Sequence, residues 1–213
     1  LAAAFFCAAI LCAMSVTGFA DGLQKVYVNT NYTNDTAVTP VDNDQAKGND
    51  DNVGTEDSPV ATITKALDLV ADNGTIYVTG GMKSVTGLNT EVSKPVTIEG
   101  LEEDGNYVVF QYPLPTATGI VTYKNFNFYG AHIFSGNSSM DYSGLDLVVD
   151  DCNFISTGNA AMNITRPINS LTVNECNFYT DESLTSYAKQ YMVWAYDAKS
   201  IVIDNNTFDG GGF

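Results

Sequence analysis

Basic side chains are scarce in this sequence. Nine Lys and Arg stand against 25 Asp and Glu, which gives a formal net charge of −16. A surface with this charge repels phosphate groups, so we expect neither nucleic acid nor an anionic membrane surface as a partner. The sequence also contains a single His and a single Arg, Arg166. Catalytic schemes that need several imidazole or guanidinium groups are therefore excluded from this stretch of chain.

Long hydrophobic runs are absent except at the start. Residues 1–20 carry no charge and end in Gly-Phe-Ala before Asp21. This pattern is typical of the apolar core and cleavage site of a secretory signal peptide. No Met or cationic segment precedes it, so we predict a signal peptide truncated at its start over residues 1–20 and an exported domain over residues 21–213. The protein would then be secreted or at the cell surface, with no membrane insertion after signal removal; a retained anchor is the alternative, because twenty uncharged residues can span a bilayer.

Cysteine is too rare for a disulfide framework. Two of the four Cys, Cys7 and Cys12, lie in the predicted signal, which leaves Cys152 and Cys176. Both stand two residues before a Phe of the repeat described next. On neighbouring parallel strands they would lie roughly 4.8 Å apart. A disulfide is open to an exported protein, but parallel Cβ vectors strain its torsion, and we expect stacked free thiols.

What the sequence does contain is a four-fold repeat. In each copy two apolar residues stand seven and five places before a Phe, and the spacings between those Phe residues are 26, 24 and 30 residues. Such a period is typical of supersecondary units that stack to bury a common core. The alternating apolar residues indicate strands. The four aromatic residues are Phe128, Phe154, Phe178 and Phe208.

A helix is expected only near the N-terminus. A strand signal at residues 25–28 is followed by a polar stretch over residues 29–57. Apolar residues then recur at helical spacing at Ile63, Ala66, Leu67 and Val70, and the pattern closes at the Asn73-Gly74 turn. Further strand signals follow at residues 75–78, 95–100 and 107–110.

These segments resemble a known family. The run from Gly54 to Leu67, GTEDSPVATITKAL, followed after a Gly turn by Ile76-Tyr77-Val78, resembles the opening of bacterial extracellular right-handed parallel β-helix proteins, the pectate-lyase-like superfamily. The resemblance implies an all-β, right-handed parallel β-helix (solenoid) with an N-terminal amphipathic capping helix. It also implies an interior stack of the four repeat Phe residues. Asn206 matches an inward asparagine ladder of that family, which Cys152 and Cys176 would break.

The resemblance does not decide whether the protein is an enzyme, because the superfamily includes lyases, hydrolases and non-catalytic adhesins. Arg166 lies outside the Arg-x-Pro-x-x-Arg pattern of the lyases. Asp150-Asp151 could supply the carboxylate pair of a hydrolase, yet the same positions are Asn174-Glu175 in the next copy. Turn chemistry explains the pair, and we expect no catalytic residues. His132, the only imidazole, is expected in a strand with a satisfied ring nitrogen.

Two groups of residues are candidate binding sites. Carboxylates crowd one loop, and calcium prefers such oxygen ligands, although Asp also favours turns without any ion. The calcium candidates are Asp42, Asp44, Asp50 and Asp51. The lengthened copy between Phe178 and Phe208 supplies the second group, the glycan-platform candidates Trp194, Tyr196 and Tyr191.

The aromatic group lies on an expected strand. Strand alternation places Met192, Trp194 and Tyr196 on one face, and Val193 and Ala195 on the other. If the small pair points inward, the large side chains form an exposed strip suited to stacking on sugar rings. If the large side chains point inward, they are core.

We therefore expect a secreted or cell-surface, non-catalytic, adhesin-like module that binds carbohydrate. Its partner would be a glycan or a host or cell-surface ligand, and it would need no cofactor other than calcium, if the acidic loop binds it. The alternative is the N-terminal part of a polysaccharide lyase or glycoside hydrolase acting on acidic plant polysaccharide. The sequence stops directly after a repeat without a polar capping unit, so we expect it to continue into further C-terminal domains.

Overall fold

The structure is a computed structural model that describes residues 22–32, 46–82, 91–103, 105–109, 113–158, 160–180 and 191–209. The predicted signal peptide, residues 1–20, lies outside the described residues. Within them, no helix is long and apolar enough to cross a membrane.

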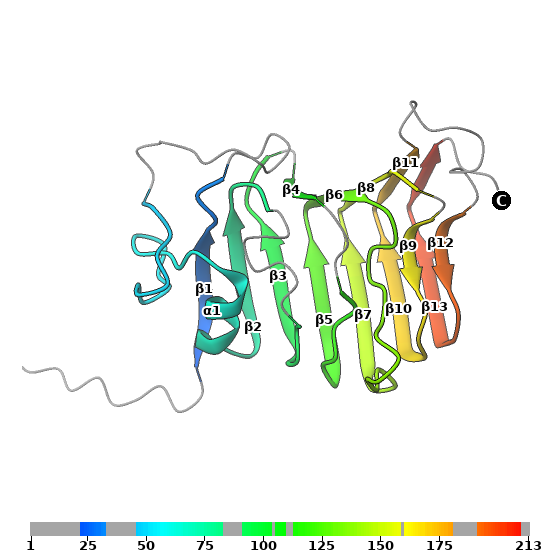
Figure 1. The fold of residues 1–213 in the computed structure, drawn as a ribbon, viewed down its shortest axis with the longest axis horizontal. Coiled ribbons are helices and arrows are strands. Elements are labelled where there is room, and N and C mark those ends of the chain that lie inside the picture. The colour runs from blue at the N-terminus through cyan, green and yellow to red at the C-terminus, as the bar shows by residue number, and fades with distance from the viewer. Residues whose placement is uncertain are drawn as a thin grey trace, which may run out of the picture.

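Parallel strands stacked in three sheets form the molecule (Figure 1). The first sheet holds, in spatial order, β1 (Leu23–Asn29), β2 (Val70–Thr79), β3 (Val96–Gly100), β5 (Gly119–Lys124), β7 (Leu145–Asp150), β10 (Ile168–Asn174) and β13 (Ala198–Asp204). The second holds β4 (Asn106–Val109), β6 (Phe126–Gly130), β8 (Asn153–Ser156), β11 (Asn177–Thr180) and β14 (Thr207–Asp209). The third pairs β9 (Ala160–Ile164) with β12 (Tyr191–Ala195). The predicted parallel β-helix is confirmed.

The repeat aligns these strands because its apolar residues face one interior. In β7 buried and half-buried residues alternate strictly, as expected for a strand with one face on the core. Leu147 of β7 pairs with Val121 on one side and Leu171 on the other, and all three are buried. A slip of one residue would turn these side chains to solvent, so the apolar pattern sets the register.

The helix α1 (Ile63–Leu69) lies beside β1 and β2 (Figure 1). The hydroxyl of Thr62 accepts a hydrogen bond from the Lys65 backbone N–H and caps the first turn. The helix buries Ile63, Ala66 and Leu67, as predicted. The prediction that it continues to the Asn73-Gly74 turn was wrong: Val70 is buried but already belongs to β2, where it pairs with Leu23 of β1. Pairing with the neighbouring strand ends the helix earlier than its apolar spacing suggests.

Each of the four repeat copies bends sharply between its strand in the first sheet and its strand in the second. The bend is made by one residue in the left-handed conformation, three positions before the repeat Phe. These corner residues are Asn125, Asp151, Glu175 and Asn205, with φ of 57°, 51°, 52° and 55°. The neighbouring Asp150 carboxylate accepts a hydrogen bond of 2.8 Å from the Asn174 amide. Asp150 and Asp151 therefore have structural roles in the turn, as the sequence indicated.

The predicted Phe stack lies inside the solenoid. Ring centroids are 4.9 Å apart for Phe128 and Phe154, 4.7 Å for Phe154 and Phe178, and 4.9 Å for Phe178 and Phe208. The first three side chains are buried, and Phe208 in the last rung is 37% exposed. Offset aromatic stacking stabilises such columns beyond the burial of apolar area.

Cys152 and Cys176 are buried free thiols, as predicted. The Cys176 Sγ lies 3.2 Å from the Asn174 carbonyl oxygen and 3.6 Å from that of Val149, one rung earlier. The Asn206 amide makes the equivalent pair of hydrogen bonds, to Asp204 at 2.8 Å and Val173 at 2.9 Å. The expected break in the ladder is thus incomplete, because the thiol lies within reach of both carbonyls, although its single S–H can donate to only one of them at a time. Burial raises the pKa of the Cys152 thiol well above its usual range, which keeps it protonated.

A second column of amides, one position later, was not predicted. The Asn153 amide donates to the Asn127 side-chain oxygen at 2.6 Å, and the Asn177 amide donates to that of Asn153 at 2.9 Å. Asn127 in turn donates to the Gly105 carbonyl. The Asn-Phe pair in three copies of the repeat was the sequence signal for this column.

Candidate ligand-binding surfaces

Trp194 and Tyr196 are exposed at the end of β12. Trp194 is 43% exposed and Tyr196 is 72% exposed. Val193 and Ala195 lie between and beside them, half-buried against the core. Of the two arrangements open to the sequence, the structure has the one in which the small residues point inward. For Tyr191 the structure describes only the backbone, which pairs with Ala160; its side chain lies outside the described part.

Met192 does not share the exposure of Trp194, so the predicted three-residue strip was wrong at this position. Its side chain is buried at 8% exposure. The neighbouring β9 explains why, because its first three residues, Ala160, Ala161 and Met162, are all buried. Near the start of both strands the core covers both faces, so neighbouring residues are all buried there. In β12, half-buried and exposed residues alternate only from Val193 onward.

The surface beside Trp194 is polar. Trp194 pairs in register with Asn163 of β9, and the Asn163 amide nitrogen lies 2.6 Å from the His132 Nδ1. His132 has a φ of 59°, so it occupies a bend and the expectation that it lies in a strand was wrong. The amide contact satisfies one ring nitrogen, as expected.

Arg166 lies on the loop that follows β9. Its Nε is buried without a hydrogen-bond partner among the described residues. A Cβ atom added at Gly136 would collide with the Arg166 side chain and approach the Tyr142 ring. The aliphatic part of Arg166 therefore packs into a space that only glycine leaves open, and this packing accounts for its position.

The calcium candidates are only partly described. Asp42 and Asp44 lie outside the described residues. The Asp50 carboxylate accepts hydrogen bonds from the backbone N–H groups of Ala61 and Thr62, at 2.9 and 3.0 Å, and from the Thr62 hydroxyl at 2.9 Å. Asp51 is exposed. Within the described ranges, no group of three or more His, Cys, Asp or Glu is arranged to hold a metal ion. Calcium binding at this loop stays a prediction.

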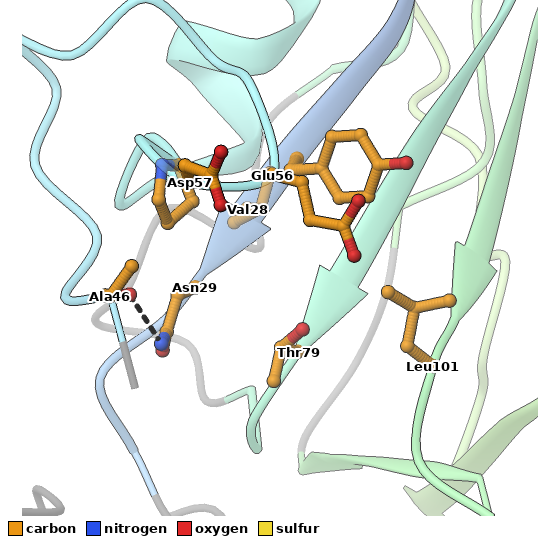
Figure 2. Close-up of a pocket in the computed structure, with 9 residues that line it drawn as sticks. Val28, Asn29, Ala46, Glu56, Asp57, Thr79 and Leu101 are labelled. Carbon is orange, nitrogen blue, oxygen red and sulfur yellow. Dashed lines mark hydrogen bonds between the residues drawn. The ribbon is translucent and has the colours of Figure 1, made fainter. Parts of the chain in front are cut away.

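A cavity of about 360 Å³ lies beside β1 (Figure 2). This is the opposite end of the stack from β12 (Figure 1). Its floor is formed by the ends of β1 and β2, and its wall by the loop that precedes α1. The lining residues are Tyr27, Val28, Asn29, Ala46, Glu56, Asp57, Pro59, Thr79 and Leu101. Glu56 and Asp57 belong to the polar stretch of residues 29–57, but the sequence did not predict the cavity, because its floor comes from strands far apart in the chain.

Residues 46–212 match the family described as "Protein of unknown function (DUF1565)". The chain belongs to the DUF1565 family. No curated protein and no solved structure matches it.

The DUF1565 match covers the corner residues, the Phe stack, Trp194 and Tyr196, and the cavity lining except the residues of β1. Of the calcium candidates, it covers Asp50 and Asp51 only. The family description assigns no activity. A function for this DUF1565 chain must therefore be argued from its surfaces.

Proposed function

We propose that the protein is a secreted or cell-surface, non-catalytic, adhesin-like β-helix module that binds carbohydrate through Trp194 and Tyr196. The observation that carries the proposal is their exposure, at 43% and 72%. Aromatic side chains stack on the apolar faces of sugar rings. The support for export is the uncharged run of residues 1–20.

The setting of the two aromatic residues suits an extended ligand. They are two positions apart along the chain where β12 ends, so their Cα atoms are roughly 6.7 Å apart if the backbone stays extended. The main chain is held on both sides of this point: β12 pairs with β9, and the Tyr196 backbone N–H donates to the Ile164 carbonyl at 2.9 Å. A preorganised surface loses little conformational entropy on binding.

The net negative charge of the protein favours neutral glycans over anionic ones. At a net charge of −16, the protein repels polyanions at long range. We therefore expect neutral glycans, rather than sulfated or uronic-acid polymers, to bind at this surface.

The test is a glycan array followed by titration of the strongest neutral hit. Trp194→Ala and Tyr196→Ala should each weaken binding about tenfold or more, equivalent to about 1.4 kcal/mol. Tyr179→Ala is the matched control, because Tyr179 is a similarly exposed aromatic residue, at 38%, on β11 of another sheet. Its binding should stay within twofold of the parent.

The single tryptophan supplies an independent readout. Trp194 emission should be quenched by acrylamide in the free protein and protected when the glycan binds. If Trp194→Ala binds as the parent does, or if the variant unfolds, the proposed platform is wrong.

A further inference from the structure

The cavity beside β1 has a wall that is held by the main chain. The loop that forms it is bonded to β1: the Tyr27 N–H donates to the Gly54 carbonyl at 2.8 Å, and the Val60 N–H donates to the Tyr27 carbonyl at 3.0 Å. The Asn29 N–H donates to the Val60 carbonyl at 2.9 Å. The wall thus behaves as an additional strand on the edge of the sheet. The cavity is part of the folded molecule.

Two carboxylates project from this wall. Residues 54–58 form a tight turn closed by hydrogen bonds between Gly54 and Ser58 at 3.0 Å and between Ser58 and Thr55 at 3.1 Å. Glu56 and Asp57 are at its tip, and neither carboxylate has a hydrogen bond or ion pair with the residues that the structure describes. In Figure 2 the Glu56 side chain extends toward Thr79 and Leu101, and Asp57 lies on the side of Ala46 and Asn29.

No described basic side chain lines the cavity to neutralise them. Lys25 lies over the Tyr77 ring, 6.0 Å from its centroid, outside the lining residues. Lys124 is 3.9 Å from Glu99. In a protein of net charge −16, a concave site with two carboxylates concentrates cations.

The rest of the lining suits an organic cation better than a bare metal ion. The Tyr27 ring packs on Tyr77 with centroids 5.1 Å apart, and an aromatic face attracts an ammonium group. The contact of Lys25 with Tyr77 shows the same chemistry on this sheet. Leu101 is 47% exposed and supplies an apolar wall, and Thr79 supplies a hydroxyl.

The volume limits the size of the ligand. About 360 Å³ is at the lower end of the range of small-molecule pockets, roughly 300–1,000 Å³. We propose that this cavity is a second binding site, distinct from Trp194 and Tyr196, that takes a hexosamine: a single sugar with a protonated amine. The amine lies between the carboxylates of Glu56 and Asp57, and the sugar ring lies against Tyr27 and Leu101.

Titration calorimetry at pH 6 with D-glucosamine tests the proposal, with N-acetyl-D-glucosamine as the neutral counterpart. Glucosamine should bind saturably, and acetylation should weaken binding about tenfold or more. The double variant Glu56→Gln/Asp57→Asn should bind glucosamine at least tenfold more weakly than the parent. Its matched control is Asp68→Asn/Asp209→Asn, which removes two exposed carboxylates elsewhere on the molecule and should bind within twofold of the parent.

Three results would overturn the proposal. If both double variants weaken glucosamine binding equally, the sugar is attracted by the overall negative charge of the protein and not by this cavity. Equal binding of the acetylated sugar would remove the role of the amine. Equal binding of n-butylammonium would remove the role of the ring.

The experiment also separates this site from the proposed glycan platform. Trp194→Ala should leave glucosamine binding unchanged, because the cavity lies beside β1, the first strand of the stack, whereas β12 lies at the other end, near β13 (Figure 1). Loss of glucosamine binding in Trp194→Ala would place the ligand at the platform and contradict the cavity assignment. Failure of the glycan array alone would leave it intact.

Discussion

Replacing Phe154 by Ala removes the central ring of the interior stack. Phe154 is fully buried and stacks on Phe128 at 4.9 Å and on Phe178 at 4.7 Å with nearly parallel planes. Large-to-small substitutions of buried Phe cost about 3–5 kcal/mol, and the cost depends on how far the site collapses. Here β8 is hydrogen-bonded to β6 and β11 on either side, so the backbone cannot move in to fill the space. We therefore expect a loss of about 4 kcal/mol in the free energy of unfolding.

Urea unfolding followed by far-UV circular dichroism and by Trp194 emission gives the measurement, provided the two transitions coincide. Phe208→Ala is the internal comparison, because Phe208 is 37% exposed and stacks on Phe178 alone among the ring contacts described. About 1–2 kcal/mol is expected there, since only part of a Phe side chain's burial free energy is at stake. A loss below about 1 kcal/mol in Phe154→Ala, or equal losses in the two variants, would falsify the argument from burial.

Two other substitutions probe the turns and the helix. Cys176→Asn should be nearly neutral and Cys176→Val destabilising by about 1–2 kcal/mol, because only the amide can make the pair of carbonyl hydrogen bonds seen for Asn206; a valine variant as stable as the asparagine variant in urea would show that these bonds are unimportant. Thr62→Ala should cost about 1–2 kcal/mol, because it removes the cap on Lys65 and the hydroxyl donor to Asp50. A change in melting temperature of less than about 1 °C would count against that role.

The fold was predictable because its signals are local and periodic. Two apolar residues and a Phe recur at constant offsets, and burial of one strand face then sets the register. The end of the helix before Val70 was not predictable. The apolar spacing there fits a helix, but pairing with Leu23 of β1 places Val70 in a strand. The same holds for Met192, where the surrounding core overrides strand alternation.

The candidate sites were predictable only in part. Exposure of Trp194 and Tyr196 was one of two arrangements consistent with alternation, and the small size of Val193 and Ala195 was the clue to the correct one. The cavity was not predictable, because Thr79 and Leu101 are brought to Glu56 only by the winding of the chain. The repeat signals contacts between equivalent positions of successive copies, such as the Phe stack, but Glu56, Thr79 and Leu101 lie outside the repeat and no periodic signal connects them.

The left-handed corners described above divide each turn into a constant part and a variable part. From each corner residue to the Phe that follows it the distance is always three residues, whereas the Phe-to-Phe spacing varies from 24 to 30. All variation in length is therefore absorbed elsewhere in the turn, on the side that carries β9, β12 and the exposed aromatic residues. A loop inserted on this side leaves the pairing register of the strands in the first and second sheets unchanged. The exposed residues of the solenoid can therefore be replaced while its interior stays the same.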